Sequence, residues 1–485
     1  MKIYNTMNAE KEELTTPDNE LGIYICGPTV YDYAHLGHAR SELVFDIIRR
    51  YLEYKGFKVK YIHNITDVDD KIIKKANDEG VSSEEVAKKY TEEYMGDMGA
   101  LGIKEADVYP KATDNILEMV GLVKGLMEKG FAYQTTSGIY FEVSKFTDYG
   151  KLSKQDIEQL ESGSRVCVDE GKRNPLDFAL WKFAKPGEPS WNSPWGRGRP
   201  GWHIECSVMS MKYLKRLDIH GGGRDLIFPH HENEIAQSEA FTGSEMSRYW
   251  MHNGFINISG EKMSKSLGNI RTIKGILEKY GAGAVRLFIL NGHYRGPINF
   301  DEDALKQAKA SFGHLQHTVE LAEEAVEGEF DPLTDKEMLD RIQKAKERFL
   351  TAMDDDFNTP FAMAEIHSIS TAINSYINKG KVNKDALRKA IATYAELAGA
   401  VGLIFKKEEK KGPRDKLEDI ISVAKKAGIN PGGNAEQVLD ALIQEREKAR
   451  KGKDYAKADL IRGELQEVGI ILEDRKEGTS WKLRD

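Results

Sequence analysis

Cysteine is scarce in this sequence, because Cys26, Cys167 and Cys206 are the only three in 485 residues. Three thiols so far apart cannot form the disulfide framework that holds small secreted domains together. Each is therefore expected to be either a buried thiol or a metal ligand.

Long apolar runs are also missing. The N-terminus soon becomes acidic without the apolar segment of a secretory signal, and no stretch is apolar over the length that a bilayer requires. We expect a soluble, cytoplasmic protein with no membrane contact. The length predicts at least three compact domains, since one core rarely serves more than a few hundred residues.

An excess of positive charge is the third absence, because the formal net charge is −8. This balance argues against a protein that coats nucleic acid through bulk charge, but it allows local contacts. Residues 406–485 carry nineteen Lys or Arg against seventeen Asp or Glu. Their basic side chains cluster between Arg446 and Lys457, which fits either an ordinary solvated helix face or a surface for a polyanion.

Hydrophobic periodicity predicts the fold class. Residues 24–26 have the pattern of a buried strand, apolar side chains then recur at helical spacing over 43–54, and residues 59–62 form another strand. Thr66 and Asp67 are capping candidates for the next helix. The alternation predicts an α/β protein with a doubly wound, Rossmann-like parallel sheet, whose ligands bind beyond the carboxyl ends of the strands.

Two motifs indicate phosphate chemistry. His35-Leu36-Gly37-His38 lies at a predicted helix start, where backbone N–H groups and the helix dipole attract phosphate, although the string alone fits a plain helix start equally well. Lys262-Met263-Ser264-Lys265-Ser266 places two cations on a loop that can close over a polyphosphate, with a solvated basic loop as the alternative. Together, in this order on a doubly wound background, they favour an enzyme that uses ATP.

This pair resembles the signature of class I aminoacyl-tRNA synthetases, and nearly the whole chain resembles the cysteinyl-tRNA synthetase family. The resemblance is carried by 26–32 (CGPTVYD), 64–67 (NITD), 201–207 (GWHIECS), 219–223 (IHGGG), 229–234 (PHHENE) and 354–360 (DDDFNTP). It implies activation of L-cysteine by ATP with Mg²⁺, followed by transfer to the terminal ribose of tRNA(Cys).

The resemblance also implies a metal site. In that family a zinc ion is bound by two Cys, one His and one Glu, which fall here on Cys26, Cys206, His230 and Glu234. His230 and Glu234 at i and i+4 share one helix face, but His231 with Glu234 fits as well, so spacing alone does not choose between the histidines. Zinc would bind a substrate thiol as thiolate and discriminate against the harder hydroxyl of serine.

Further roles follow from the same resemblance. Thr66, Trp202 and His220 would line the cysteine pocket, although Thr66 equally fits a helix cap and the other two fit core positions. The implied catalytic residues are His35, His38, Lys262 and Lys265. The implied ATP-binding residues are His35, His38, Gly223, Asp225 and Lys265.

The domain organisation is expected to follow the family. The predicted parts are a first catalytic half at 1–110, a connective insertion at 111–200, a second catalytic half with the Lys262–Ser266 loop at 201–270, a stem-contact region at 271–305, a helical tRNA-binding domain at 306–405 and an anticodon-binding module at 412–485. In this module Arg446, Arg450 and Lys453 would hold phosphates while Trp481 stacks on an unpaired base. The resemblance thins at 474–477, where the family more often has a Thr-Pro pair.

The expected partners are tRNA(Cys), ATP and L-cysteine, and the expected state is a monomer. Two rival functions stay open, namely a related ligase that joins cysteine to an amino sugar and a noncatalytic tRNA-binding or zinc-stabilised paralogue. A persulfide-forming activity with pyridoxal phosphate has been associated with the family, and Lys71 and Lys74 have the lysine spacing for it.

Overall fold

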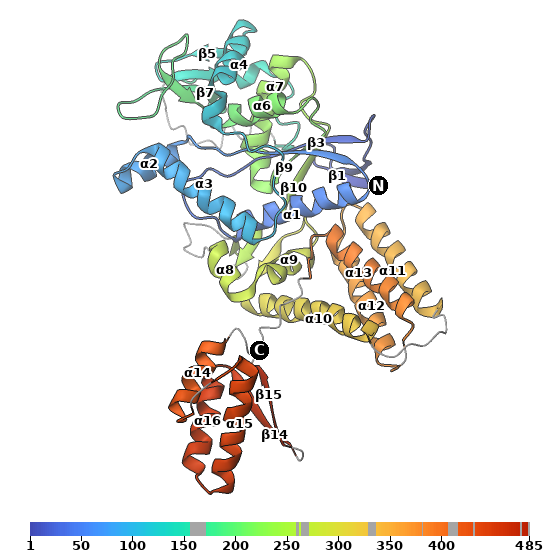
Figure 1. Cartoon of the computed structure of the whole chain (residues 1–485). Helices are drawn as coiled ribbons and strands as arrows, with labels where there is room; N and C mark the ends of the chain where they lie inside the picture. Colours follow the sequence, from blue (N-terminus) through green and yellow to red (C-terminus); the bar gives the residue numbers. More distant parts are fainter. Residues whose placement is uncertain are drawn as a thin grey trace. The chain divides into compact units, whose positions relative to one another are not determined.

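The computed structural model divides into two compact units, Met1–Phe405 and Lys406–Asp485 (Figure 1). It describes residues 1–155, 171–258, 261–262, 271–327, 336–380, 382–405, 416–429, 432–475 and 478–483. Of residues 261–262, 473–475, 478, 480 and 482–483 it describes the backbone alone. Within these ranges no helix combines the length and the apolar character that a membrane crossing demands.

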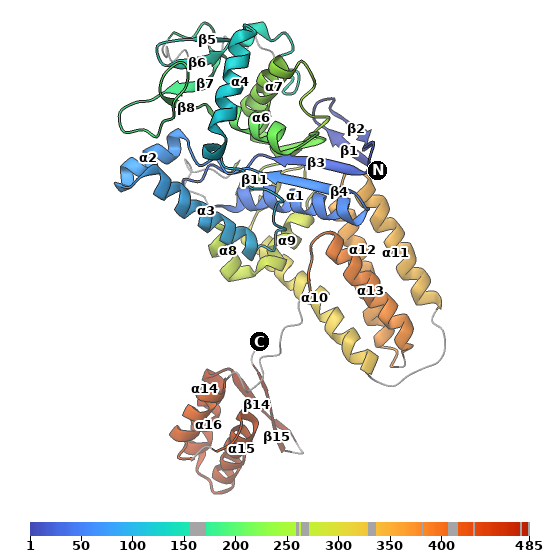
Figure 2. The same cartoon turned by 45° about the horizontal axis from the view of Figure 1, so that its top comes forward.

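A four-stranded parallel sheet forms the centre of the first unit. Its order is β10 (Tyr249–Asn253), β9 (Ile219–Gly223), β3 (Glu20–Ile25) and β4 (Lys58–His63). Helix α1 (Leu36–Tyr54) follows β3 and lies along the sheet (Figure 2), and α7 (Glu232–Thr242) connects β9 to β10. The predicted doubly wound α/β class is confirmed. The strand order reverses between β3 and β9, which is where such sheets bind ligands.

The helix that follows β4 begins later than the capping candidates predicted. Helix α2 (Asp70–Glu79) has Asp69 as its N-cap, whose side chain accepts a hydrogen bond from the Lys71 backbone. Thr66 and Asp67 were therefore the wrong caps. The Thr66 hydroxyl donates to Glu205 at 2.7 Å instead. Helix α3 (Ser83–Ala100) then begins with a complete capping box at Ser82.

The connective insertion contains a second sheet that the sequence did not indicate. After α4 (Ile116–Glu128), four short strands pair antiparallel in chain order. They are β5 (Ala132–Gln134), β6 (Gly138–Phe141), β7 (Phe178–Phe183) and β8 (Gly198–Pro200). This sheet packs with α4, α6 (Trp202–Tyr213) and α7 around buried Phe141 and Trp181. It supports α6 and α7, which carry much of the candidate site.

The rest of the first unit is mostly helical. A small sheet contains β11 (Ile256–Ile258), β12 (Glu261–Lys262) and β13 (Ile298–Phe300). The helices are α8 (Ile273–Tyr280), α9 (Ala282–Leu290), α10 (Glu302–Glu327), α11 (Lys336–Asp354), α12 (Thr359–Ile377) and α13 (Lys384–Ala400). The last four pack on one another (Figure 1). A buried ion pair at 2.6 Å between Asp46 of α1 and Arg286 of α9 joins α9 to the central sheet domain.

The chain's N-terminal hairpin fixes the β10 edge of the sheet. It consists of β1 (Lys2–Asn5) and β2 (Glu10–Glu13), and Thr6 N donates to the Trp250 carbonyl at 2.8 Å. Asp356, between α11 and α12, accepts hydrogen bonds from the Tyr4 backbone, the Tyr294 hydroxyl and Arg295 Nε. One buried carboxylate thus ties together three parts of the unit.

The second unit is a small α/β module. It contains α14 (Leu417–Lys426), α15 (Ala435–Lys451), α16 (Tyr455–Glu467) and the hairpin β14 (Ile470–Arg475) and β15 (Gly478–Leu483). Its own core gathers Ile420, Leu439, Leu442, Ile461 and Leu465. The charged segment 407–413, between the two units, lies outside the described residues.

Candidate functional site

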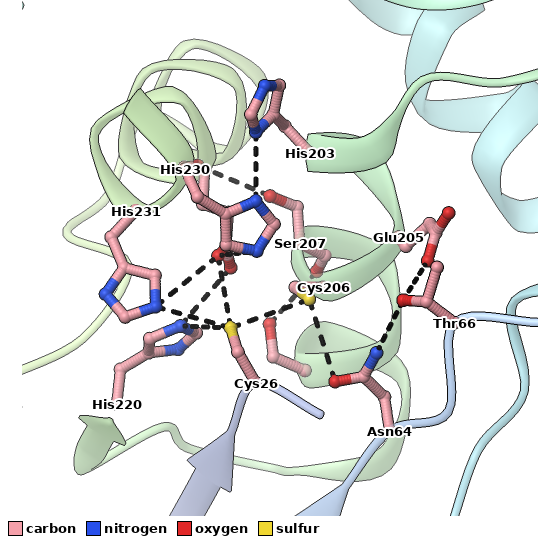
Figure 3. Close-up of polar contacts among 12 residues, drawn as sticks. Cys26, Asn64, Thr66, His203, Glu205, Cys206, Ser207, His220, His230 and His231 are labelled. Carbon is pink, nitrogen blue, oxygen red and sulfur yellow. Dashed lines mark hydrogen bonds and ion pairs between the residues drawn. The ribbon is translucent and has the colours of Figure 1, made fainter. Parts of the chain in front are cut away.

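Six potential metal ligands converge at the switch point of the sheet. Figure 3 labels all of them except Glu234. Cys26 follows β3, His220 lies in β9, and Cys206 is on α6. His230 and His231 directly precede α7, and Glu234 lies in its first turn. All six side chains are buried, with exposures between 0 and 9 %.

The distances between these side chains suit a tetrahedral metal. Cys26 Sγ lies 3.6 Å from Cys206 Sγ and 3.5 Å from Glu234 Oε1, and His230 Nε2 lies 3.0 Å from Glu234 Oε1. Around a zinc ion with bonds of about 2.0 to 2.3 Å, neighbouring ligand atoms lie roughly 3.3 to 3.8 Å apart. The cluster therefore has nearly the spacing that coordination requires.

A second set of four overlaps the first. It consists of Cys26, His220, His231 and Glu234, with Cys26 Sγ 3.5 Å from His220 Nε2 and 3.3 Å from His231 Nε2. His231 Nε2 lies 4.0 Å from Glu234 Oε1, whereas His230 Nε2 lies 3.0 Å from the same oxygen. Both sets contain Cys26 and Glu234. The first adds Cys206 and His230, and the second adds His220 and His231.

Both candidate histidines are oriented by another imidazole. His230 Nδ1 lies 2.9 Å from His203 Nδ1, and His231 Nδ1 lies 2.8 Å from His252 Nε2. Each hydrogen bond leaves Nε2 directed at the cluster, as in metal sites where the second ring nitrogen is held by a partner. Because both histidines have such a partner, these hydrogen bonds do not distinguish His230 from His231 as the ligand.

Burial sets the protonation of the cluster. Desolvation by burial raises the pKa of the Cys26 thiol well above its usual value, and the neighbouring Cys206 and Glu234 raise it further. Burial likewise lowers the pKa of His230 and His231 well below the ordinary value, so both rings are neutral. Neutral imidazoles can bind a metal, and a cation would offset the cost of ionising the thiols.

Thr66 belongs to a hydrogen-bond chain next to the cluster. Asn64 Oδ1 accepts from the Gly27 backbone at 2.8 Å, and its Nδ2 donates to Thr66 Oγ1, which donates to Glu205. Thr66 is 1 % exposed and does not line the adjacent cavity. The structure therefore places Thr66 where it braces the turn after Cys26.

A cavity of about 370 Å³ opens from the cluster along the carboxyl ends of the strands. Its walls bring together Cys26, Trp202, the two histidines of the first motif and the residues after β9 and β10. The predicted site residues among its lining are Cys26, His35, His38, Trp202, Gly223 and Asp225. One space thus joins the metal-capable cluster to the predicted phosphate site.

His35 and His38 are arranged by the helix start itself. His35 is the N-cap of α1, its Nδ1 accepts from the Gly37 backbone at 3.1 Å, and its own N–H donates to His38 Nδ1 at 3.2 Å. The rings stack with centroids 3.9 Å apart. Because each Nδ1 accepts a hydrogen bond, a neutral ring carries its proton on Nε2. Two N–H donors thus stand at the positive end of a helix.

Trp202 and His220 occupy different positions although both were predicted for the amino-acid pocket. Trp202, 38 % exposed, lies on the cavity wall and stacks on His230 with ring centroids 4.3 Å apart. His220 is fully buried and lies 3.3 Å from Glu234 Oε2, below the cavity and inside the cluster.

The remaining predicted residues lie elsewhere. The side chain of Lys262, all of Lys265 and Cys167 lie outside what the structure describes. In the second unit Arg450 and Lys453 are exposed, Trp481 is partly buried over the module's core, and Arg446 is only 3 % exposed. Arg446 Nη1 donates to Thr479 Oγ1 at 3.4 Å, so its described contact is internal to the module.

Several residues near the cluster were not singled out by the sequence. Three of them orient metal-capable side chains or the turn after Cys26, namely His203, Asn64 and Glu205. Only their position within the stretches shared with the family could have indicated them. The ring of His252 likewise contacts His231 and Thr6. The cavity wall begins at the next residue, Asn253.

Known proteins share this architecture. Mycobacterium tuberculosis methionyl-tRNA synthetase in complex with methionyl-adenylate has a TM-score of 0.58 at 16 % identity, covering 87 % of this chain and 94 % of that one. The Agrobacterium radiobacter K84 agnB2 LeuRS in a ternary complex has a TM-score of 0.57 at 12 % identity, covering 80 % and 86 %. The model described as tRNA synthetases class I (C) catalytic domain matches residues 13–310. The fold and its cavity thus define a class I aminoacyl-tRNA synthetase.

Full-length relatives narrow the assignment. Cysteine–tRNA ligases of Thermodesulfovibrio yellowstonii and Thermococcus onnurineus are 49 % and 47 % identical, covering 100 % and 99 % of both chains. Models of a DALR domain and of a cysteinyl-tRNA ligase anticodon binding domain match residues 348–406 and 436–481. This chain belongs to the cysteine–tRNA ligase family.

Proposed function

We propose that the protein activates L-cysteine with ATP and transfers the cysteinyl group to tRNA(Cys), with a zinc ion selecting the substrate thiol. One observation carries the proposal. The cavity of about 370 Å³ has a metal-capable Cys/His/Glu cluster at one end and paired imidazole donors at a helix start along its wall. An amino acid whose side chain is a thiol fits the first, and a polyphosphate fits the second.

The donor set fits zinc better than a hard cation. Two cysteines and a histidine supply soft and borderline ligands beside one carboxylate, whereas Mg²⁺ and Ca²⁺ prefer oxygen alone. We assign Cys26, Cys206, His230 and Glu234 as the ligands, because this set includes both thiols and the shorter histidine–glutamate distance. Zinc, when bound, would favour the thiolate form of cysteine over the hydroxyl of serine.

The protein's own residues orient the amino acid in this scheme. Trp202 lies at the cavity wall against His230 and would cover the substrate side chain, while His220 lies within the cluster. Thr66 acts through Asn64 and Glu205 by holding the turn after Cys26. A turn after Cys26 that is held rigidly in this way would orient the substrate with its carboxylate toward the phosphate site.

Activation requires stabilisation of charge on phosphate. The cysteine carboxylate attacks the α-phosphate of Mg²⁺-bound ATP, pyrophosphate leaves, and cysteinyl-adenylate results. The Nε2–H groups of His35 and His38 would donate to the phosphate oxygens, helped by Lys262 and Lys265. Asp225, beside Gly223 on the cavity wall, would accept the ribose hydroxyls of ATP.

The acceptor in the second step is tRNA. A ribose hydroxyl of its terminal nucleotide attacks the activated carbonyl and releases AMP. The second unit supports this acceptor, because it corresponds to the matched anticodon binding domain and exposes Arg450 and Lys453 near the end of α15. A ligase that joins cysteine to an amino sugar needs no such module.

The test is aminoacylation of total tRNA with cysteine and with serine, before and after treatment with a zinc chelator. We expect charging with cysteine, at least about 100-fold less with serine, and recovery by zinc after chelation. Equal charging with both amino acids would refute zinc selection. A lack of cysteine-dependent ATP–pyrophosphate exchange would refute the catalytic role itself and favour the noncatalytic paralogue.

A further inference from the structure

A second cavity lies on the other side of the β10 end from the reaction cavity. Its volume is about 440 Å³. Its lining residues come from the N-terminal strand, from the turn after β9, from β10 and from the loop before β13. They are Tyr4, Thr6, Arg224, Ile227, His252, His293, Arg295, Gly296 and Pro297. We call it the Arg224–Arg295 cavity.

The polar side chains that line this cavity are basic or neutral. It contains two guanidinium groups, two imidazoles and two hydroxyl groups, and no carboxylate. Guanidinium groups bind phosphate through planar, charge-assisted hydrogen bonds, and hydroxyl groups can add further donors. A cavity with this lining accepts an anion and rejects a cation.

Arg295 is held in place from behind. Its Nε donates to the buried carboxylate of Asp356 at 2.7 Å, and its guanidinium carbon lies 4.2 Å from the centroid of the Tyr4 ring. Asp356 neutralises that charge in part. Arg224 is exposed, and it makes no hydrogen bond or ion pair with any residue that the structure describes. Its charge therefore remains available to a ligand.

The location of the cavity indicates which molecule carries the anionic group. Arg224 and His252 line this cavity, while their chain neighbours Asp225 and Asn253 line the reaction cavity. The end of β10 and the turn after β9 thus contribute neighbouring residues to both spaces. A strand that enters the reaction cavity past the ends of β9 and β10 would carry its preceding phosphates along this second cavity.

We propose that the Arg224–Arg295 cavity binds one backbone phosphate of the tRNA acceptor strand and so holds the terminal nucleotide in register for transfer. This inference rests on the proposed function, because it requires tRNA as the acceptor. It adds a contact in the first unit to those of the C-terminal module. Binding of ATP and of cysteine does not involve this cavity in the proposal.

The primary variant is Arg224→Gln, with Arg224→Glu to reverse the charge. The matched control is Lys215→Gln, an exposed cation at the opposite, amino-terminal end of the strands. Arg295 is left unchanged because it supports buried Asp356. Three quantities are measured: cysteine-dependent ATP–pyrophosphate exchange, the KM for tRNA, and the salt dependence of the Kd for tRNA.

We expect Arg224→Gln to raise the KM for tRNA about fivefold and to reduce the slope of log Kd against log salt by about one, the change for one lost phosphate contact. Arg224→Glu should raise the KM further. Exchange should stay unchanged in both, and Lys215→Gln should resemble the parent protein. Normal exchange in the parent keeps a failure here separate from a failure of the proposed function.

Two results would overturn the proposal. One is an unchanged KM for tRNA and an unchanged salt slope in both Arg224 variants. The other is that the variants weaken inhibition by added pyrophosphate or inorganic phosphate while tRNA binding stays the same. The cavity would then be a site for a free phosphate, not for the nucleic acid.

Discussion

Replacing Cys206 by serine separates the two metal-ligand sets that the structure allows. Cys206 Sγ lies 3.6 Å from Cys26 Sγ and is 2 % exposed, so water cannot easily take its place. The set with His230 includes Cys206, whereas the set with His231 does not. Cys206→Ser should therefore remove the metal only if the His230 set is the real one.

The magnitude follows from the chemistry of the substitution. Serine keeps nearly the same volume but presents a hydroxyl that does not ionise near neutral pH, so one soft, charged ligand out of four is lost. Loss of a supporting residue around a metal ligand costs about 10- to 100-fold in affinity, and loss of a ligand should cost at least the upper figure. The KM for cysteine should rise by a similar factor while the KM for ATP stays within about twofold, since His35 and His38 are untouched.

The assay compares Cys206→Ser, His230→Gln and His231→Gln for metal content, zinc affinity by chelator competition, and exchange kinetics with varied cysteine and varied ATP. Cys167→Ser serves as the control thiol substitution and should behave like the parent protein. Full metal content and normal cysteine affinity in Cys206→Ser, together with metal loss in His231→Gln, would refute our assignment in favour of the other set. Equal losses for cysteine and ATP in Cys206→Ser would refute the proposed role of the metal site in binding cysteine.

Three further substitutions test other parts of the site. His35→Asn keeps an N-cap for α1 but removes the imidazole, so exchange should fall about 100-fold with unchanged helix content by circular dichroism. Gly27→Ala should lower the free energy of unfolding by about 3 kcal/mol in denaturant titration, because a Cβ would lie 1.6 Å from the Asn64 carbonyl oxygen. Asp46→Asn should cost about 3 kcal/mol near neutral pH, since it leaves buried Arg286 without its ion pair. Burial alone would raise the pKa of Asp46, but Arg286 and Arg50 hold it below its usual value, so the difference from the parent should shrink as pH falls below about 4.

The central sheet could be predicted from the sequence because its signals are local. Buried strands and an amphipathic helix between them leave a clear period in the chain. The antiparallel sheet of the insertion could not, because β8 is Gly198–Pro200 and its identity as a strand depends on pairing with distant β7. Likewise, the choice of Thr66 as a cap failed because its hydroxyl is taken by Glu205, which lies 139 residues away.

The site could be predicted only where a family motif joined distant residues. Cys26 and Cys206 are 180 residues apart, and no spacing argument connects them. The burial of Arg446 could have been predicted from its helical spacing, because it lies four residues after buried Leu442 and seven after buried Leu439. Grouping it with exposed basic residues overlooked that phase, and Arg446 therefore supports the module from within.

The cluster also explains how the two halves of the sheet domain are held at the switch point. Cys26 follows β3 of the first half, while Cys206, His230 and Glu234 belong to the second half around β9. Burial raises the pKa of both thiols, so their ionisation for coordination would be unfavourable without a nearby cation. A bound metal would therefore cross-link the halves where the amino acid must sit. In the proposed assignment, substrate selection and the link between the halves would depend on the same four side chains.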